Sequence, residues 1–344
     1  MRAAVLHAPR DLRIDESAAP EIAPGQVRVR VQAGGICGSD LHYYLHGGFG
    51  TIRIKEPMVL GHEVAGVVES VAPDVTTVAP GQIVAVNPSQ PCHHCRYCRM
   101  GLQNQCLNMR FYGSAMVFPH VQGGFREFLV VDADRAVPIP QEVSVYEAAF
   151  AEPLAVALHA VTRAGSLLGK RVLVAGAGPI GALTVAAARA AGAGEIVVTD
   201  LHDAALESAR AVGADRAINM AKTPEALSAF EAEKGYFDVM FEAAGSEATL
   251  LGGLKIVRAR GTIVQIGQGA QASLPMSMLV TKEIDLIGTF RFHAEFALAV
   301  DTIAHRRIDV RPLLTDVIPL SDAVRAFELA ADRTRAMKVQ LGFD

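Results

Sequence analysis

The sequence places four cysteines at a spacing that suits a metal ion. Cys92, Cys95, Cys98 and Cys106 follow one another at intervals of three, three and eight residues. A short loop with this spacing can fold back and offer tetrahedral thiolates to one zinc ion. Because thiolates then fill every coordination position, such a site is structural and not catalytic. We predict a zinc-stapled lobe over about residues 88–110, in which Arg96 and Arg99 could offset the charge of the thiolates.

A second set of possible metal ligands comes from separate segments. Cys37 is the only cysteine outside the lobe and has a glycine within two residues on either side. His62 and Glu63 follow another glycine, and Glu152 precedes a proline. Taken singly, each has a structural alternative, because cysteines and histidines pack in cores and glutamates cover surfaces. Together, thiolate, imidazole and carboxylate from separate loops predict a catalytic zinc site with one coordination position open to substrate.

The third chemical feature is a glycine-rich turn after a short apolar run. Gly176, Gly178 and Gly181 form a G-x-G-x-x-G pattern that leads into an alanine-rich segment. These glycines permit the turn, let a pyrophosphate approach the backbone and let the helix pack on the strand. Pro179 suits the first helical turn, where Ile180 also lies and free N–H groups face the phosphates. The pattern predicts a Rossmann dinucleotide-binding site.

An acidic residue stands where such a site binds ribose. Asp200 ends the second expected strand, nineteen residues after Gly181. Its carboxylate would accept hydrogen bonds from the ribose hydroxyls and repel a 2′-phosphate. No lysine or arginine occurs from residue 201 to residue 207, which favours NAD over NADP. A turn or helix N-cap role is the alternative for Asp200.

Composition restricts the class of protein. A chain of 344 residues, 51% hydrophobic, is long enough for two domains with substantial cores. The net charge is −4 with both signs interspersed, which argues against nucleic acid or a membrane surface as partner. The first residues lack the pattern of a secretory signal and cysteine is sparse, so we expect a cytoplasmic protein. Residues 172–198 are apolar but interrupted by glycine and proline, which favours a buried strand and helix over a membrane span.

The composition and hydrophobic pattern of the chain change near residue 151. Residues 1–150 contain short β-branched runs between glycines and prolines, which is typical of a mostly-β, barrel-like domain. Alanine-rich segments then alternate with buried strands, which predicts an α/β domain with a parallel sheet. We expect its strands at residues 171–175, 195–200, 237–242 and 261–267. The tail contains a strand-like run, a helix-like run and a last strand. We predict one domain from residues 1–150 plus 285–344, with residues 151–284 inserted as the Rossmann domain.

These motifs resemble the zinc-containing medium-chain dehydrogenase/reductase family over nearly the whole chain. Residues 39–43 and 57–63 are similar to its polyol branch, and residues 109–116, 118–121 and 289–292 are most similar to members that oxidise L-idonate. The resemblance implies a GroES-like catalytic domain with both zinc ions and an inserted Rossmann domain. It also implies NAD(P)-linked oxidation of a secondary alcohol to a ketone, in a homodimer or homotetramer.

The resemblance also implies roles for single residues. Cys37 and His62 become ligands of the catalytic zinc, while Glu63 and Glu152 compete for a ligand or water-binding role. Ser39 takes the substrate proton and His42 passes it toward solvent. Pocket positions are matched by Tyr43, Phe111, Arg291 and Phe292. Two residues depart from sorbitol dehydrogenases. Those enzymes carry tyrosine where this chain has Phe292, which weakens a sorbitol assignment. They carry an arginine where this chain has Ala205, which loosens the binding of the adenosine end of the coenzyme.

We expect a small-molecule sugar acid or polyol as substrate, with L-idonate oxidised to 5-keto-D-gluconate. The oxidised C5 lies several bonds from the C1 carboxylate, so a cation should lie at the far end of the pocket. Arg291 is the first candidate and Arg110 the second, although either could simply be solvated. Sorbitol or xylitol oxidation is the alternative. A zinc-free reductase, or a crystallin-like protein that binds dinucleotide without catalysis, fits less well because every ligand is present.

Overall fold

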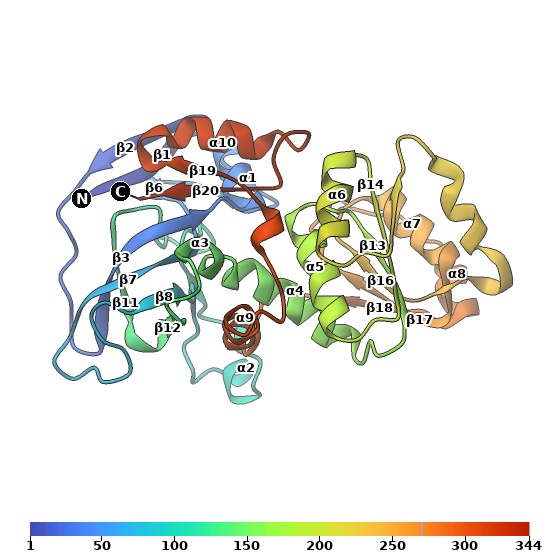
Figure 1. Cartoon of the computed structure of the whole chain (residues 1–344), viewed down its shortest axis with the longest axis horizontal. Helices are drawn as coiled ribbons and strands as arrows, with labels where there is room; N and C mark the ends of the chain where they lie inside the picture. Colours follow the sequence, from blue (N-terminus) through green and yellow to red (C-terminus); the bar gives the residue numbers. More distant parts are fainter. Residues whose placement is uncertain (270, 344) are drawn as a thin grey trace.

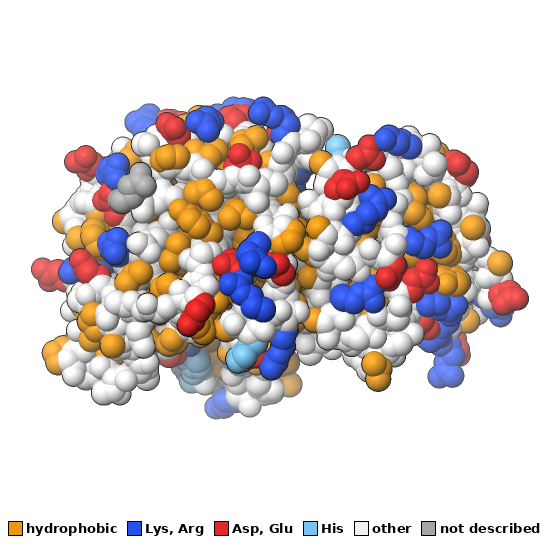
Figure 2. Space-filling model, viewed as in Figure 1, with side chains coloured by type: hydrophobic (Ala, Val, Ile, Leu, Met, Phe, Trp, Pro, Cys, Tyr) orange, Lys and Arg blue, Asp and Glu red, His pale blue; other side chains and the backbone are white. Residues whose placement is uncertain are grey.

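The computed structural model describes residues 1–269 and 271–343. It consists of a mostly-β half that holds both chain ends and an α/β half beside it (Figure 1). Acidic and basic side chains are interspersed over the face shown in Figure 2. Among the described residues no helix has the length and apolar character needed to span a bilayer. Ala270 and Asp344 fall within the predicted domain ranges but outside the described residues.

The mostly-β half is built on a seven-stranded sheet. Its order is β12-β8-β7-β3-β20-β19, with β11 also paired to β3. In β3 the valines alternate with arginines and are buried, which is the period-two pattern of a half-buried strand. The strands are β3 (Gln26–Gly35), β7 (Glu63–Val71), β8 (Ile83–Val86), β11 (Phe128–Asp132), β12 (Ala136–Pro138), β19 (Leu314–Pro319) and β20 (Lys338–Gly342).

Smaller elements close this half. Helix α10 covers the sheet on the side of β19 and β20 (Figure 1). The elements are β1 (Arg2–Ala8), β2 (Asp11–Glu16), β4 (Gly48–Phe49), β5 (Ile52–Arg53), β6 (Met58–Val59), β9 (Ser89–Gln90), β10 (Arg110–Phe111), α1 (Gly38–His46), α2 (Arg96–Arg99), α3 (Val145–Ala148) and α10 (Ala323–Ala331).

The α/β half contains a six-stranded parallel sheet. Its order is β15-β14-β13-β16-β17-β18, the doubly wound order of a dinucleotide-binding domain. The strands are β13 (Arg171–Ala175), β14 (Glu195–Asp200), β15 (Arg216–Asn219), β16 (Phe237–Glu242), β17 (Val257–Gln265) and β18 (Asp285–Gly288). The helices are α5 (Pro179–Ala190), α6 (Asp203–Ala211), α7 (Glu247–Ile256) and α8 (Met276–Lys282).

Two helices join the halves. Helix α4 (Ala151–Ala164) packs against α5 on one side and against α9 (Glu295–Ala304) on the other. One continuous hydrophobic core contains residues of α4, α5 and α9 together with residues of both sheets. Because this core crosses the junction, the two halves do not depend on a flexible linker for their relative position.

The predicted boundary at residue 284 is wrong by one strand. β18 pairs in parallel with β17, so the α/β sheet continues to Gly288 before the chain returns to the mostly-β half. A short edge strand carries no signal of its own for the sheet that it joins, since either sheet would accept its pattern of apolar residues.

Candidate active site

Cys37, His62 and Glu63 come together at the end of β3. One ligand atom from each lies within 4.8 Å of the others. Cys37 is the N-cap of α1, directly after β3, and Glu63 opens β7, where it stands opposite Gly35 of β3. A Cβ atom on Gly35 would lie 2.1 Å from Oε2 of Glu63, so only glycine leaves room for this carboxylate.

The residue before His62 must be glycine because of its backbone conformation and surroundings. Gly61 has a φ of 93°, and a Cβ atom there would lie 2.2 Å from the ring of Phe125. Asp40, fully buried in α1, accepts hydrogen bonds from the N–H of Cys37 at 3.0 Å and from that of Gly61 at 3.1 Å. One carboxylate therefore ties both ligand-bearing segments to each other.

The same carboxylate lies near the imidazole. Oδ1 of Asp40 is 3.8 Å from Nδ1 of His62, which is longer than a hydrogen bond, and Nδ1 is buried without a hydrogen-bond partner among the described residues. Sequence reasoning gave Asp40 no role, although its place three residues after Cys37 is where a capping residue reaches back to its N-cap.

Lys338 is a second residue that sequence reasoning missed. Its Nζ lies 2.7 Å from Oε1 and 2.5 Å from Oε2 of Glu63, and 3.2 Å from the carbonyl oxygen of Ile36. Only the contact with Oε1 has hydrogen-bond geometry, so Oε2 stays buried without a donor. Burial opposes the charge on Lys338, but Glu63 and Cys37 outweigh it and raise the pKa of this lysine. No motif marks Lys338, because only the fold brings β20 beside β3.

The atoms that Cys37, His62 and Glu63 offer can be compared with the ligands that zinc prefers. A buried carboxylate, a partly exposed thiol and a buried imidazole whose Nδ1 has no hydrogen-bond partner among the described residues form a suitable donor set for Zn²⁺. Burial, followed by the charge of Glu63, raises the pKa of Cys37 to about 11, an environment that a divalent cation would reverse. The residues present therefore fit the predicted catalytic zinc.

Glu152 lies near this triad but outside it. It is the second residue of α4 and is buried. Burial, and then the charges of Glu63 and Cys37, raise its pKa to about 8, while His62 acts in the opposite direction. Of the two competing glutamates, Glu63 is the one that the structure places within the ligand triad.

Ser39 and His42 both lie on α1 next to Cys37. Ser39 is half-buried in the first turn, and His42 follows one turn later at the surface. Partial burial, and then His46 and Arg333, lower the pKa of His42, so its imidazole is neutral at pH 7 and can accept a proton. The helix thus places a hydroxyl near the triad and an imidazole between it and solvent.

Of the predicted pocket residues, Phe111 and Arg291 meet beside the triad. The Phe111 ring centroid lies 5.6 Å from that of His62, and the guanidinium carbon of Arg291 lies 4.0 Å from the Phe111 centroid. Tyr43 is buried, and its hydroxyl accepts a hydrogen bond from the N–H of Ala115 at 3.1 Å. Tyr43 therefore supports the pocket wall with its hydroxyl already engaged.

Phe292 does not reach the site. Only 1% of it is exposed, and its ring packs 5.7 Å from that of Phe296 within the core between the two halves. The difference between tyrosine and phenylalanine at this position therefore gives no direct argument against a polyol substrate. Arg291, the preceding residue, points to the site because its backbone adopts a left-handed φ of 53°.

The left-handed backbone and the buried charge of Arg291 both cost free energy. A left-handed backbone costs a non-glycine residue about 1–2 kcal/mol. Burial lowers the pKa of Arg291 to about 10, and Glu152 is the carboxylate that opposes this shift. Within residues 1–269 and 271–343, Arg291 makes no ion pair shorter than 4.0 Å. Arg110, the second candidate for a pocket cation, is exposed in β10.

The cysteine lobe brings its four sulfur atoms together. The distances are 3.6 Å between Cys95 and Cys98, 4.0 Å between Cys95 and Cys106, and 3.4 Å between Cys106 and Cys92. Thiolates at about 2.3 Å from one tetrahedral zinc lie about 3.8 Å apart, so the four sulfurs fit the predicted ion.

Neighbouring amides, and not arginines, face the sulfurs. Nδ2 of Asn108 lies 3.5 Å from Sγ of Cys92, and the backbone N–H of Asn108 donates to Sγ of Cys106 at 3.3 Å. The Asn108 side chain is the main cause that lowers the pKa of Cys92 to about 5. Arg96 instead stacks on Tyr97 and donates to its hydroxyl at 2.7 Å, so it does not hydrogen-bond the thiolates, and an offset of their charge by Arg96 and Arg99 stays a prediction.

The glycine motif borders a large cavity. This cavity measures about 1,040 Å³ and is lined by Gly176, Gly178, Pro179 and Asp200. Gly176 has a φ of 95°, and a Cβ atom on Gly181 would lie 1.8 Å from the carbonyl oxygen of Gly176. Ile180 lies in the first turn of α5 behind the loop. The turn and the helix packing thus need glycine at Gly176 and Gly181, while the approach of a phosphate at Gly178 stays a prediction.

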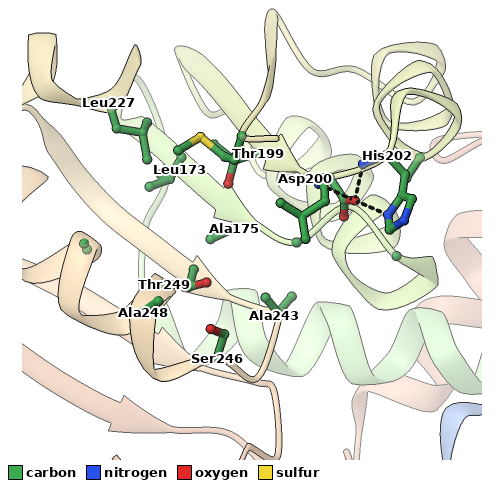
Figure 3. Close-up of a pocket in the computed structure, with 18 of the residues that line it drawn as sticks. Leu173, Ala175, Thr199, Asp200, His202, Leu227, Ala243, Ser246, Ala248 and Thr249 are labelled. Carbon is green, nitrogen blue, oxygen red and sulfur yellow. Dashed lines mark hydrogen bonds and ion pairs between the residues drawn. The ribbon is translucent and has the colours of Figure 1, made fainter. Parts of the chain in front are cut away.

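Asp200 lines the cavity (Figure 3) and also braces the glycine loop. Its Oδ2 accepts from the N–H of Ala177 at 2.7 Å, and its Oδ1 accepts from the N–H groups of Leu201 and His202. Each carboxylate oxygen has two lone pairs, so the turn role and a ribose role are compatible.

Arg333 faces the glycine loop from the other half. Its Nη1 lies 3.2 Å from the position that a Cβ atom on Gly178 would take, and it lines the same cavity. Sequence reasoning missed this residue, since it follows α10 and lies far along the chain from the motif. Glycine loop and arginine together make a site for a pyrophosphate.

Comparison with known proteins was made on the whole chain. The family described as "Alcohol dehydrogenase GroES-like domain" matches residues 23–141, and the family described as "Zinc-binding dehydrogenase" matches residues 179–305. L-idonate 5-dehydrogenase (NAD(P)(+)) of Escherichia coli (strain K12) is 48% identical over 316 residues, which cover 92% of this chain and 91% of that protein.

Two further similarities concern a polyol enzyme and a solved structure. Sorbitol dehydrogenase of Homo sapiens is 37% identical over 328 residues, which cover 94% of this chain and 91% of that protein. The crystal structure of L-idonate 5-dehydrogenase from Escherichia coli K-12 superimposes with a TM-score of 0.95 at 45% identity, covering 99% of this chain and 98% of that one.

The lobe gives the first testable prediction. Replacing Asn108 with alanine removes the side-chain amide that faces Cys92, so zinc should leave the lobe about tenfold faster. Zinc transfer to a coloured chelator measures this release. Gln105→Ala, an exposed amide of the same lobe, is the control and should release zinc at the wild-type rate. Equal rates for Asn108→Ala and wild type would contradict the role of Asn108.

The glycine loop gives the second prediction. A Cβ atom on Gly178 meets only the flexible Arg333 side chain, whereas one on Gly181 meets backbone at 1.8 Å. Gly178→Ala should therefore keep the thermal unfolding temperature but raise the Kd for NADH roughly tenfold, or ~1.4 kcal/mol. Gly181→Ala should lower the unfolding temperature. NADH fluorescence titration and calorimetry measure the two effects, and unchanged NADH affinity in Gly178→Ala would refute the loop's phosphate role.

Proposed function

The chain belongs to the family of zinc-binding alcohol dehydrogenases with a GroES-like domain, and we propose that it oxidises L-idonate at C5 to 5-keto-D-gluconate. It is an NAD(P)-dependent zinc oxidoreductase whose substrates are small sugar acids or polyols. The reaction removes a hydride from the carbinol carbon and a proton from its hydroxyl, so that a secondary alcohol becomes a ketone.

The bound groups supply the Lewis acid that lowers the pKa of the substrate hydroxyl and the nicotinamide that accepts the hydride. We propose that Cys37, His62 and Glu63 hold the catalytic zinc and that Glu152 binds a water molecule beside it. The support is the triad itself, which brings one ligand atom from each residue within 4.8 Å of the others. The four lobe cysteines would hold a second zinc, which makes two per chain.

The proton leaves through α1 in this proposal. The Ser39 hydroxyl accepts the proton of the substrate hydroxyl and passes its own to His42, which lies at the surface. The lowered pKa of His42 keeps its imidazole neutral and ready to accept at pH 7. Because a helix carries both groups, their separation is fixed by its turn and not by a mobile loop.

Arg291 carries the substrate assignment. Its guanidinium lies over Phe111 beside the triad and lacks an ion-pair partner among the described residues. A half-buried arginine in this state gains much from a carboxylate, which it can bind through two parallel N–H donors. The C1 carboxylate of L-idonate, several bonds from the oxidised C5, supplies that partner, whereas sorbitol has none.

The preference of NAD over NADP is also a proposal. Asp200 lines the cavity, and no lysine or arginine follows it before residue 208. A carboxylate at this position repels a 2′-phosphate. Ala205 lines the same cavity, so no cation from this turn reaches the adenosine end.

We further propose that subunits pair through β18. This strand forms the edge of the parallel sheet, and Leu286 within it is 37% exposed. An unpaired edge with an exposed apolar side chain is a template for a strand of a second subunit. A homodimer or a homotetramer satisfies this edge.

The substrate proposal predicts a ranking that NADH production can measure. The zinc-replete protein should oxidise L-idonate with a higher kcat/KM than sorbitol, and L-threonine more slowly than either. Arg291→Ala removes a charge-assisted pair of about 2 kcal/mol, so kcat/KM for L-idonate should fall ~30-fold. Arg110→Ala, which removes an exposed arginine of the same pocket region, is the control and should stay near wild type. A wild-type preference for sorbitol would assign the chain to general polyol oxidation instead.

The edge-strand proposal predicts a change of mass in solution. Leu286→Lys places a charge on the edge of β18, so sedimentation should show one chain where the wild type shows two, or two chains where it shows four. Leu298→Lys, at an exposed position of α9, should leave the mass unchanged. An unaltered oligomer with Leu286→Lys would exclude pairing through this edge.

A further inference from the structure

We infer that Asn104 of the cysteine lobe is a positioning residue for Arg291, so that the lobe helps to set recognition of a substrate carboxylate. The inference rests on the proposed function, because it concerns the arginine assigned to the carboxylate of L-idonate. It gives the lobe a task at the active site that is distinct from metal-dependent folding.

The first contact joins the lobe to the residue before Arg291. Asn104 lies two residues before Cys106, in the short 3₁₀ turn Gln103–Gln105, and its side chain is buried. Its Nδ2 donates to the carbonyl oxygen of Phe290 at 3.0 Å, across 186 residues of sequence. The lobe thus holds the backbone at the point where the chain turns toward the site.

A second set of contacts holds the residues after Arg291. The backbone N–H of His293 donates to Oε2 of Glu295 at 3.0 Å. Oε1 of Glu295 lies 3.1 Å from Nδ1 of His159, and Nε2 of His159 lies 3.5 Å from Nδ2 of Asn104. The contacts form a closed ring that runs from the lobe through α4 and α9 and back, with Arg291 inside it.

The ring also reaches the helix that carries Glu152. His159 lies seven residues after Glu152 on α4, which is two helical turns and the same face. One face of α4 therefore carries the glutamate beside the ligand triad and the histidine that holds the Arg291 segment. The lobe, helix α4 and the Arg291 segment are therefore connected by one network of contacts.

The backbone of Arg291 explains why such a ring is needed. Its φ of 53° is a left-handed conformation that a non-glycine residue keeps only when its surroundings enforce it. Stacking on Phe111 at 4.0 Å and on Phe290 at 5.0 Å, with a contact of 3.0 Å to Sδ of Met116, fixes the side chain but not the backbone. On the N-terminal side the N–H of Thr289 donates to the carbonyl oxygen of Gln265 at 3.2 Å, and the hydrogen bond from Asn104 to Phe290 holds the peptide directly before Arg291.

The test replaces the donor while keeping the shape. Asn104→Asp is nearly isosteric but cannot donate to the carbonyl of Phe290, and Asn104→Ala removes the contact altogether. We expect the KM for L-idonate to rise five- to tenfold in both variants, while kcat with L-idonate and the KM for sorbitol and NAD stay within twofold of wild type. Gln105→Ala, the exposed neighbour in the same turn, should match wild type in every constant.

A double variant separates positioning from general damage. If Asn104 acts through Arg291, adding Asn104→Asp to Arg291→Ala should change the KM for L-idonate by less than twofold. Hydrogen exchange of the peptide around residues 289–293 should quicken in Asn104→Asp, and zinc content should stay at the wild-type value.

The outcomes distinguish this inference from the proposed function. A wild type that prefers sorbitol overturns the proposed function, and the carboxylate part of the inference with it. A wild type that prefers L-idonate, with an unchanged KM in Asn104→Asp, overturns the inference alone. A full additive loss in the double variant, or loss of lobe zinc in Asn104→Asp, also overturns it, because the asparagine would then act on the lobe and not on Arg291.

Discussion

The buried ion pair of Glu63 with Lys338 is the interaction on which the catalytic half depends. The two side chains are 1% and 3% exposed and are separated by 275 residues of sequence. Charges in such a setting are tolerated only when they are paired and hydrogen-bonded, and loss of one partner costs about 3–5 kcal/mol. The pair therefore ties β20 to β7, the strand that begins with the proposed ligand Glu63, and it fixes the position of that carboxylate.

The return of the chain after the α/β half supplies more than this lysine. Arg333, Ala336 and Met337, which directly precede β20, line the cavity that the glycine loop borders. The same segment thus supports the metal triad through Lys338 and faces the dinucleotide site through Arg333. Because both functions lie within six residues, the spacing between metal and coenzyme is set by one short stretch of backbone.

Local signals in the sequence predicted those parts of the site that the chain builds locally. The lobe cysteines, the glycine loop with Asp200, and three of the parallel strands at their observed limits all follow from spacing and periodicity. The prediction that Phe292 lines the pocket was wrong. Its ring packs in the core, and the left-handed residue before it, Arg291, faces the site instead. Lys338 and Arg333 could not be assigned from sequence, since their roles depend on pairings across the fold and no motif records them. Asp40 stands at a capping position three residues after Cys37, which local spacing could have revealed. Strand β15 carried too little apolar pattern to be seen, with an exposed first residue and half-buried ones after it.

The balance of charge in the site supports the proposal that an arginine at its rim recognises an anion. Cys37, Glu63, Glu152 and Asp40 share one buried region, and in the part of the chain described here Lys338 is the one lysine or arginine in ion-pair contact with them. Their mutual repulsion and burial raise the pKa of Cys37 and Glu152, so the acids hold their charges together only with a divalent cation among them. With that cation bound the positive and negative charges nearly cancel, and the metal has little net attraction left for a second carboxylate. A sugar acid must then place its carboxylate away from the metal, where Arg291 provides positive charge that the acids of the site do not already use.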